Sequence, residues 1–165
     1  MTKHKDLDLL EDVPHQELEW KLEWAGWALM GVLFIGNLLG FFGRGLFNDA
    51  RLGEPGAALQ VDYQKRERYK AVSFFDLHID ADVAGTSPRV TLGSDFLNKV
   101  RITEISPEPV AVHAGAGRQI YQFSALAGEP VDVRIFYEPF EAGFSTTRVG
   151  LEGSVEYEFR QFFFP

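Results

Sequence analysis

The chain has 165 residues, of which 45% are hydrophobic and 14% aromatic, and it carries a formal net charge of −8. This apolar content suffices for a packed core and excludes a disordered chain, and the length suits one domain with an appendage. The acidic balance argues against general nucleic-acid binding, so no nucleic-acid partner is expected. Because there is no cysteine, disulfides, thiolate metal sites and thiol nucleophiles are excluded.

Residues 1–23 are polar and acidic, and we expect them to form an N-terminal tail that ends in an interfacial lead-in. Pro14 suits the first turn of a helix. Leu18, Trp20 and Leu22 then lead directly into an apolar stretch, as in a segment that lies at a membrane surface.

Residues 24–43 contain no ionisable side chain. At a rise of about 1.5 Å per residue the stretch spans roughly 30 Å, the thickness of a hydrocarbon core. Trp20, Trp24 and Trp27 gather at one end, as aromatic rings do at a lipid–water boundary. A buried core helix would carry a polar stripe, and a cleaved signal peptide would begin with basic residues and be shorter. We therefore predict a retained transmembrane α-helix over residues 24–43.

Two glycines and an amide lie within this predicted span. Gly36 and Gly40 have the G-x-x-x-G spacing that lets two helix backbones approach closely, and Asn37 lies beside them. A side-chain amide in lipid requires a partner. These residues predict a helix–helix contact, with a membrane-protein partner or with a second copy, although glycine is also common in membrane helices without such a role.

The charges that flank the predicted span indicate its orientation only weakly. Lys21 precedes the span, whereas Arg44 and Arg51 follow it, so a positive-inside count favours a cytoplasmic C-terminal domain. Long domains, however, translocate largely regardless of charge. We expect a single-pass protein whose C-terminal domain is extracytoplasmic, and the reverse orientation is the alternative.

Residues 44–58 contain several glycines and a proline and are predicted to form a linker. In the rest of the chain apolar and polar residues alternate in seven segments: 59–63, 75–81, 89–92, 100–105, 119–124, 131–137 and 155–162. Such short segments between Gly/Pro turns predict an all-β antiparallel sandwich of immunoglobulin-like kind over residues 59–165, with a small β-barrel as the alternative. Without a Cys…Trp…Cys core it is not an antibody-type domain.

No catalytic signature is present. The sequence lacks G-x-S-x-G, S-x-x-K and Walker motifs, so no catalytic residue and no cofactor are predicted, and the protein is expected not to be an enzyme. Asp76, His78 and Asp80 share one face of a predicted strand and are the only weak candidates for a metal site. The simpler interpretation is a solvated polar face, because no second ligand cluster is visible.

A basic patch follows the predicted span by about twenty residues and consists of Lys65, Arg66, Arg68 and Lys70. Such a patch can contact anionic headgroups or an acidic partner surface. Alternatively, it is a charged edge strand that prevents pairing with another sheet. Near the C-terminus, alternation predicts Phe162 and Phe164 on one face of the last strand and Phe163 on the other.

The run from Gly40 to Arg68, with a glycine-rich exit from the span and then Leu-x-Val-x-Tyr-x-x-x-x-Arg, resembles uncharacterised bacterial single-span membrane proteins with a C-terminal β-sandwich domain. The resemblance implies a bacterial inner-membrane setting. It carries no catalytic residue.

We therefore expect a non-enzymatic, membrane-anchored accessory protein. Its span contacts a partner helix through Gly36, Asn37 and Gly40, and its sandwich docks through the basic patch. The alternatives are a membrane-tethered ligand- or metal-sensing domain and a membrane-tethered hydrolase, which would need a cleft with paired carboxylates.

Overall fold

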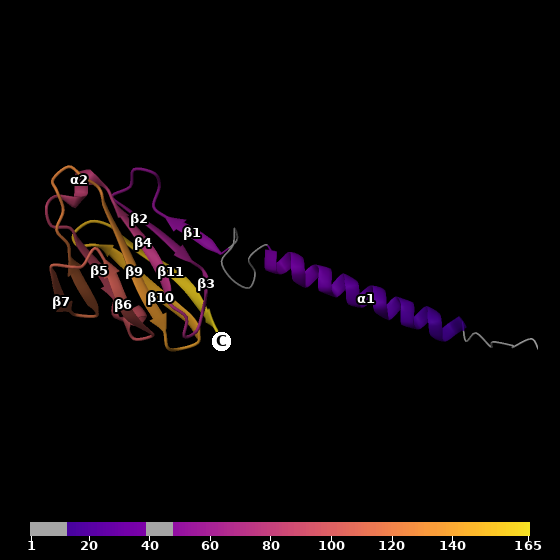
Figure 1. Ribbon diagram of the computed structural model, residues 1–165. Coiled ribbons are helices and arrows are strands. Elements are labelled where there is room, and N and C mark those ends of the chain that lie inside the picture. The colour runs from indigo at the N-terminus through magenta and orange to yellow at the C-terminus, as the bar shows by residue number, and fades with distance from the viewer. Residues whose placement is uncertain (1–12, 39–47) are drawn as a thin grey trace, which may run out of the picture.

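The computed structural model describes residues 13–38 and 48–165 (Figure 1). Helix α1 runs from Val13 to Leu38 and begins beside Pro14. Within these two ranges no helix combines the length and the apolar character needed to cross a membrane. The transmembrane helix predicted over residues 24–43 is therefore not confirmed, and its residues 39–43 lie outside the described ranges.

Residues 48–165 form a two-sheet β-sandwich, which confirms the predicted fold at this level (Figure 1). The first sheet, sheet A, contains in spatial order β1 (Asp49–Leu52), β2 (Leu59–Gln64), β4 (Ser73–Ile79), β9 (Val131–Pro139) and β6 (Val100–Ser106). Sheet B contains β3 (Arg66–Arg68), β11 (Glu156–Phe164), β10 (Gly143–Leu151), β5 (Arg89–Gly93), β8 (Arg118–Gln122) and β7 (Ala111–Gly115). Two short helices, α2 (Ala81–Ala84) and α3 (Ser94–Leu97), complete the domain.

Neighbouring strands pair antiparallel except for β3 and β11, which run parallel. The two separate sheets differ from the small barrel that was the alternative. Three of the eleven strands in the described part of the chain were not predicted from the sequence: β1, β7 and β10. β3 lies at the edge of sheet B, as in the alternative interpretation of the basic patch as a charged edge strand. β1 lies inside the predicted linker of residues 44–58 and pairs with β2, so the sandwich begins before residue 59.

The core lies between the sheets and follows from the two-residue period of the strands. In β4, the buried Phe75, Leu77 and Ile79 alternate with partly exposed Asp76 and His78. Sheet B contributes inward residues in the same way. The fully buried ring of Phe96, from α3, packs edge-on against Tyr137 with 5.0 Å between ring centroids.

Candidate interaction surfaces

Helix α1 exposes large apolar side chains on all sides. Every such side chain from Leu18 to Leu38 is between 51% and 77% exposed, and this set includes Trp24, Trp27 and Phe34. A helix that is apolar all round normally lies in a protein core or in a membrane. No described residue covers these side chains.

The predicted helix–helix contact falls at the end of α1. Asn37 is exposed and Gly36 is partly exposed, whereas Gly40 lies outside the described residues. The contact remains a prediction.

The short strand β3, which carries the basic patch, is fixed on both of its edges. On one edge it pairs with β11, where the N–H of Phe162 donates to the carbonyl of Lys65 at 2.8 Å. On the other edge the amide of the buried Asn48 donates through Nδ2 to the carbonyl of Arg66 at 2.7 Å and accepts through Oδ1 from the N–H of Arg66 at 2.7 Å. The Asn48 side chain thus substitutes for a neighbouring strand.

Only two of the four residues of the basic patch lie within β3, and the other two flank it. Arg66 and Arg68 point to the outer face of sheet B, while Glu67 between them is 3% exposed and points into the core. Lys65 is exposed at the bend that precedes β3. Lys70 adopts a left-handed φ of 57° and places its Nζ 5.1 Å from the centroid of the Tyr69 ring.

The register of β3, β11 and β10 brings aromatic side chains beside the arginines. Arg66 lies opposite Phe162 and Arg68 opposite Phe164, and all four are on the outer face. Phe163 is fully buried, so the predicted alternation of the last phenylalanines is confirmed.

Phe144 of β10 and Arg160 of β11 extend this surface. The ring of Phe144 is 62% exposed and lies 4.9 Å from that of Phe162, centroid to centroid. The guanidinium of Arg160 lies 5.2 Å from the centroid of Phe144, within cation–π range. We call this surface the basic–aromatic face and define it by six residues: Arg66, Arg68, Phe144, Arg160, Phe162 and Phe164. Sequence analysis missed Phe144 and Arg160, because only the strand order of sheet B brings them to β3.

Two other arginines of sheet B, Arg148 and Arg89, have carboxylate partners. Arg148 donates to Glu158 at 2.9 Å and lies 3.5 Å from Asp95, and these two carboxylates raise the pKa of Arg148. Arg89 pairs with Glu152 at 3.0 Å. In contrast, among residues 13–38 and 48–165 no ion pair includes Arg68 or Arg160.

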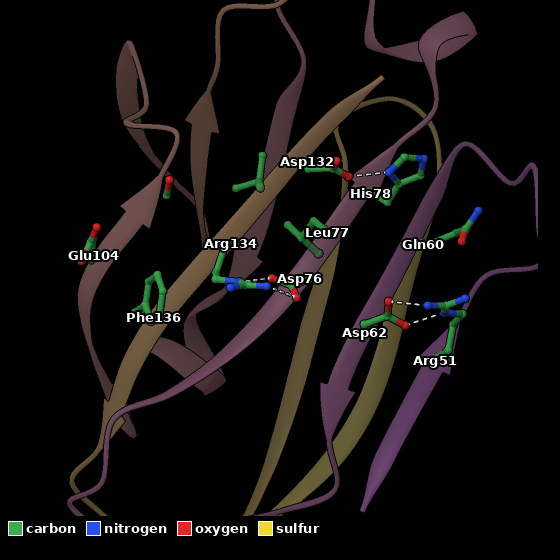
Figure 2. Close-up of a pocket in the computed structure, with 12 residues that line it drawn as sticks. Arg51, Gln60, Asp62, Asp76, Leu77, His78, Glu104, Asp132, Arg134 and Phe136 are labelled. Carbon is green, nitrogen blue, oxygen red and sulfur yellow. Dashed lines mark hydrogen bonds and ion pairs between the residues drawn. The ribbon is translucent and has the colours of Figure 1, made fainter. Parts of the chain in front are cut away.

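The outer face of sheet A carries pairs of opposite charges along an open groove (Figure 2). Asp76 accepts two hydrogen bonds from Arg134, at 2.6 and 2.9 Å, and this contact raises the pKa of the Arg134 guanidinium. Arg51 donates to Asp62 in the same bidentate way. Both Arg51 and Arg134 therefore already have a carboxylate partner within this face.

The structure does not bring the weak metal candidates together. Asp76 is held by Arg134, and His78 Nδ1 lies 2.5 Å from a carboxylate oxygen of Asp132. Asp80 caps helix α2 by accepting from the N–H of Asp82 at 3.0 Å. In the described ranges no three His, Asp or Glu side chains form a cluster that could hold a metal ion.

A buried polar cluster joins the two sheets behind β3. The Tyr137 hydroxyl donates to Glu67 Oε2 at 2.6 Å and accepts from Gln161 Nε2 at 2.9 Å. Thr147 donates to Gln161 Oε1 at 3.0 Å. Burial, and next the negative charge of Glu67, raise the pKa of Tyr137 well above 10, so this hydroxyl stays protonated as a donor.

Comparison with known proteins adds no assignment to this geometry. The chain matches no protein-family profile and no curated protein. The functional argument therefore rests on the exposed apolar helix, the basic–aromatic face and the fold.

Proposed function

We propose that this protein is a non-enzymatic, membrane-anchored accessory protein of a bacterial inner membrane, with an extracytoplasmic β-sandwich that serves interaction. The single observation that carries the proposal is the exposure of large apolar side chains on every side of α1. Leaving such a surface in water is unfavourable, by about 25 cal/mol per Å² of apolar area.

The anchor in this proposal is the stretch of residues 24–43. Residues 24–38 belong to α1, and the following Leu39-Gly-Phe-Phe-Gly43 continues the sequence without an ionisable group. The complete stretch reaches the roughly 20 residues that a hydrocarbon core requires. Trp20, Trp24 and Trp27 then lie at one interface.

The strand order supports an immunoglobulin-like sandwich. The order β2-β4-β9-β6 in sheet A corresponds to the A-B-E-D sheet of that fold, and β11-β10-β5 corresponds to G-F-C. The chain order departs from that fold at one point. β6, which corresponds to strand D, precedes the β7–β8 hairpin in the chain, whereas strand D normally follows the additional strands C′ and C″. Sandwiches of this kind frequently serve as extracytoplasmic interaction domains, which fits an accessory role.

The anchor can be tested with intrinsic fluorescence, because all three tryptophans lie in α1. We expect the full-length protein, reconstituted in vesicles, to show blue-shifted tryptophan emission that lipids with brominated acyl chains quench. A Leu33→Lys/Phe34→Lys variant should lose this quenching, because each charge at the centre of a span costs about 3 kcal/mol. Phe140→Lys, on the sandwich surface, is the matched control. Emission unaffected by brominated lipid in the unmodified protein would contradict the anchor.

The accessory role requires a partner for the span. We propose that Gly36, Asn37 and Gly40 contact a partner helix. Gentle detergent extraction followed by mass spectrometry should recover a stoichiometric membrane protein or a second copy, and Gly36→Leu/Gly40→Leu should release it. Gly26→Leu/Gly31→Leu is the control, because it adds the same bulk elsewhere on α1. A protein that is recovered alone, with and without these changes, would contradict the accessory role.

A further inference from the structure

We propose that the basic–aromatic face binds the anionic headgroups of the membrane in which the protein is anchored. This inference rests on the proposed anchor and names the surface that the sandwich turns toward the lipid.

The chemistry of the face suits a phospholipid surface. A planar guanidinium can donate two parallel hydrogen bonds to one phosphate. Arg68 and Arg160 have no ion pair in the described part of the chain. Phe144, on the neighbouring strand β10, provides a largely exposed ring that can enter the headgroup region. Lys99 adds a further cation, because its Nζ donates to the carbonyl of Phe144 at 2.7 Å.

The position of the face along the chain brings it near the membrane. Residue 43 ends the proposed anchor, and Asn48 is already bonded to Arg66. Five residues extend at most about 18 Å, so Asn48, which is bonded to the strand that carries Arg66 and Arg68, is tethered within that distance of the interface. Tethering of this kind gives a high effective concentration of headgroups around the face.

The charge distribution supports one orientation. Residues 48–165 contain twelve basic and seventeen acidic residues, a net charge of −5. An anionic surface repels such a domain unless a cationic face is turned toward it. Glu158 pairs with Arg148 and Glu152 pairs with Arg89, whereas Glu67 of β3 is buried and accepts from the Tyr137 hydroxyl.

The role of an edge protector does not account for these arginines. Charged side chains on an edge strand oppose pairing of that edge with a strand from another chain. Here the Asn48 amide already occupies the N–H and carbonyl of Arg66 on the outer edge of β3. The side chains of Arg66 and Arg68 project from the sheet face and are not needed to close this edge.

The test uses the full-length protein in vesicles and a fluorophore on the face. Because the chain contains no cysteine, Thr146→Cys provides a unique labelling site opposite Arg160 on sheet B, and Gln60→Cys provides a control site on sheet A. We expect energy transfer from the Thr146 label to a headgroup-labelled lipid to be stronger with phosphatidylglycerol than with phosphatidylcholine alone. The Gln60 label should show no such increase, and added salt should reverse the increase at Thr146.

Arg68→Gln/Arg160→Gln tests the arginines directly. Each arginine near an anionic surface contributes about fivefold to the ratio of docked to undocked sandwich, so the double variant should lower this ratio about 25-fold. Arg101→Gln/Arg118→Gln is the matched control, because it removes the same charge from β6 and β8. Far-UV circular dichroism checks that both variants remain folded.

Three outcomes would overturn the inference. The first is equal energy transfer from the Thr146 label with both lipids. The second is an equal loss of energy transfer in the two double variants. The third is that the Thr146 label becomes shielded from solvent only when an acidic protein is added. In each case quenching of the α1 tryptophans by brominated lipid is measured in the same sample. If that quenching persists, only the lipid-binding face fails, whereas its loss indicates that the anchor itself fails.

Discussion

Asn48 holds Arg66 through both backbone polar groups of that residue, with its amide donating and accepting at 2.7 Å each. In addition, the carbonyl of Asn48 accepts from the N–H of Lys65 at 2.8 Å. The first described residue of the sandwich is thereby bonded to the strand that carries the basic patch.

Asn48→Ala should destabilise the sandwich by about 2 kcal/mol, because the backbone groups of Arg66 lose their partners in a half-buried position. Urea unfolding followed by circular dichroism measures this loss. Asn98→Ala, at an exposed position after α3, should change the stability by less than about 0.5 kcal/mol. Equal stability of the two variants would show that the Asn48 contacts do not hold β3.

Gly53→Ala should be more destabilising than Gly56→Ala. Both glycines have a positive φ, 87° and 84°, which costs an alanine about 1 kcal/mol. A Cβ on Gly53 would also collide with the backbone carbonyl of Leu59, whereas a Cβ on Gly56 meets no atom within 4 Å. Thermal unfolding of the two variants tests this difference, and a lower melting temperature for Gly56→Ala would contradict it.

The stability of the sandwich should fall as the pH rises above about 10. The pKa of Tyr137 is raised in the folded protein, first by burial and second by Glu67, whereas the unfolded chain releases this proton near its ordinary value of 10.0. Between the two pKa values the folded state binds more protons, so a rise in pH favours unfolding. The stabilisation is complete below pH 10 and is lost as the pH rises toward the folded-state pKa.

Tyr137→Phe should remove part of this pH dependence and should cost about 2 kcal/mol at neutral pH, because Glu67 and Gln161 each lose a hydrogen bond. Burial also raises the pKa of Tyr63 and Tyr121, so some alkaline destabilisation should persist. The test is to measure the free energy of unfolding as a function of pH for the unmodified protein and for Tyr137→Phe. Parallel pH profiles would exclude Tyr137 as the source.

The bidentate ion pair of Asp76 and Arg134 should contribute little to the free energy of unfolding, despite its short hydrogen bonds. Both side chains are more than a third exposed, and exposed ion pairs contribute about 0–1 kcal/mol. Arg134→Met should therefore change the free energy of unfolding by less than about 1 kcal/mol, and by less again at high salt. A loss above 2 kcal/mol, about the size expected for Asn48→Ala, would indicate a buried or coupled interaction.

The strands that the sequence predicts are those in which most of the buried residues are apolar. In β2 and β4, and also in β9, alternate residues are hydrophobic and point inward, so the two-residue period is visible without a structure. For the same reason Phe162, Phe163 and Phe164 were assigned to the correct faces. The exposed apolar surface of α1 likewise follows from composition alone.

Only the tertiary structure shows which polar side chains of β10 and β3 point inward. β10 turns Ser145 and Thr147 into the core, and β3 turns Glu67 inward, so neither strand shows an apolar period. Glu67 is buried with a partner from a distant strand, Tyr137, and Thr147 with a partner from β11, Gln161. The basic–aromatic face has the same origin, since β3 and β11 are separated by about ninety residues yet pair in parallel. Local hydrophobic patterns in the sequence indicate which apolar side chains are buried. The hydrogen-bond partners of buried polar groups are instead brought together by the pairing and packing of strands, which the local pattern does not show.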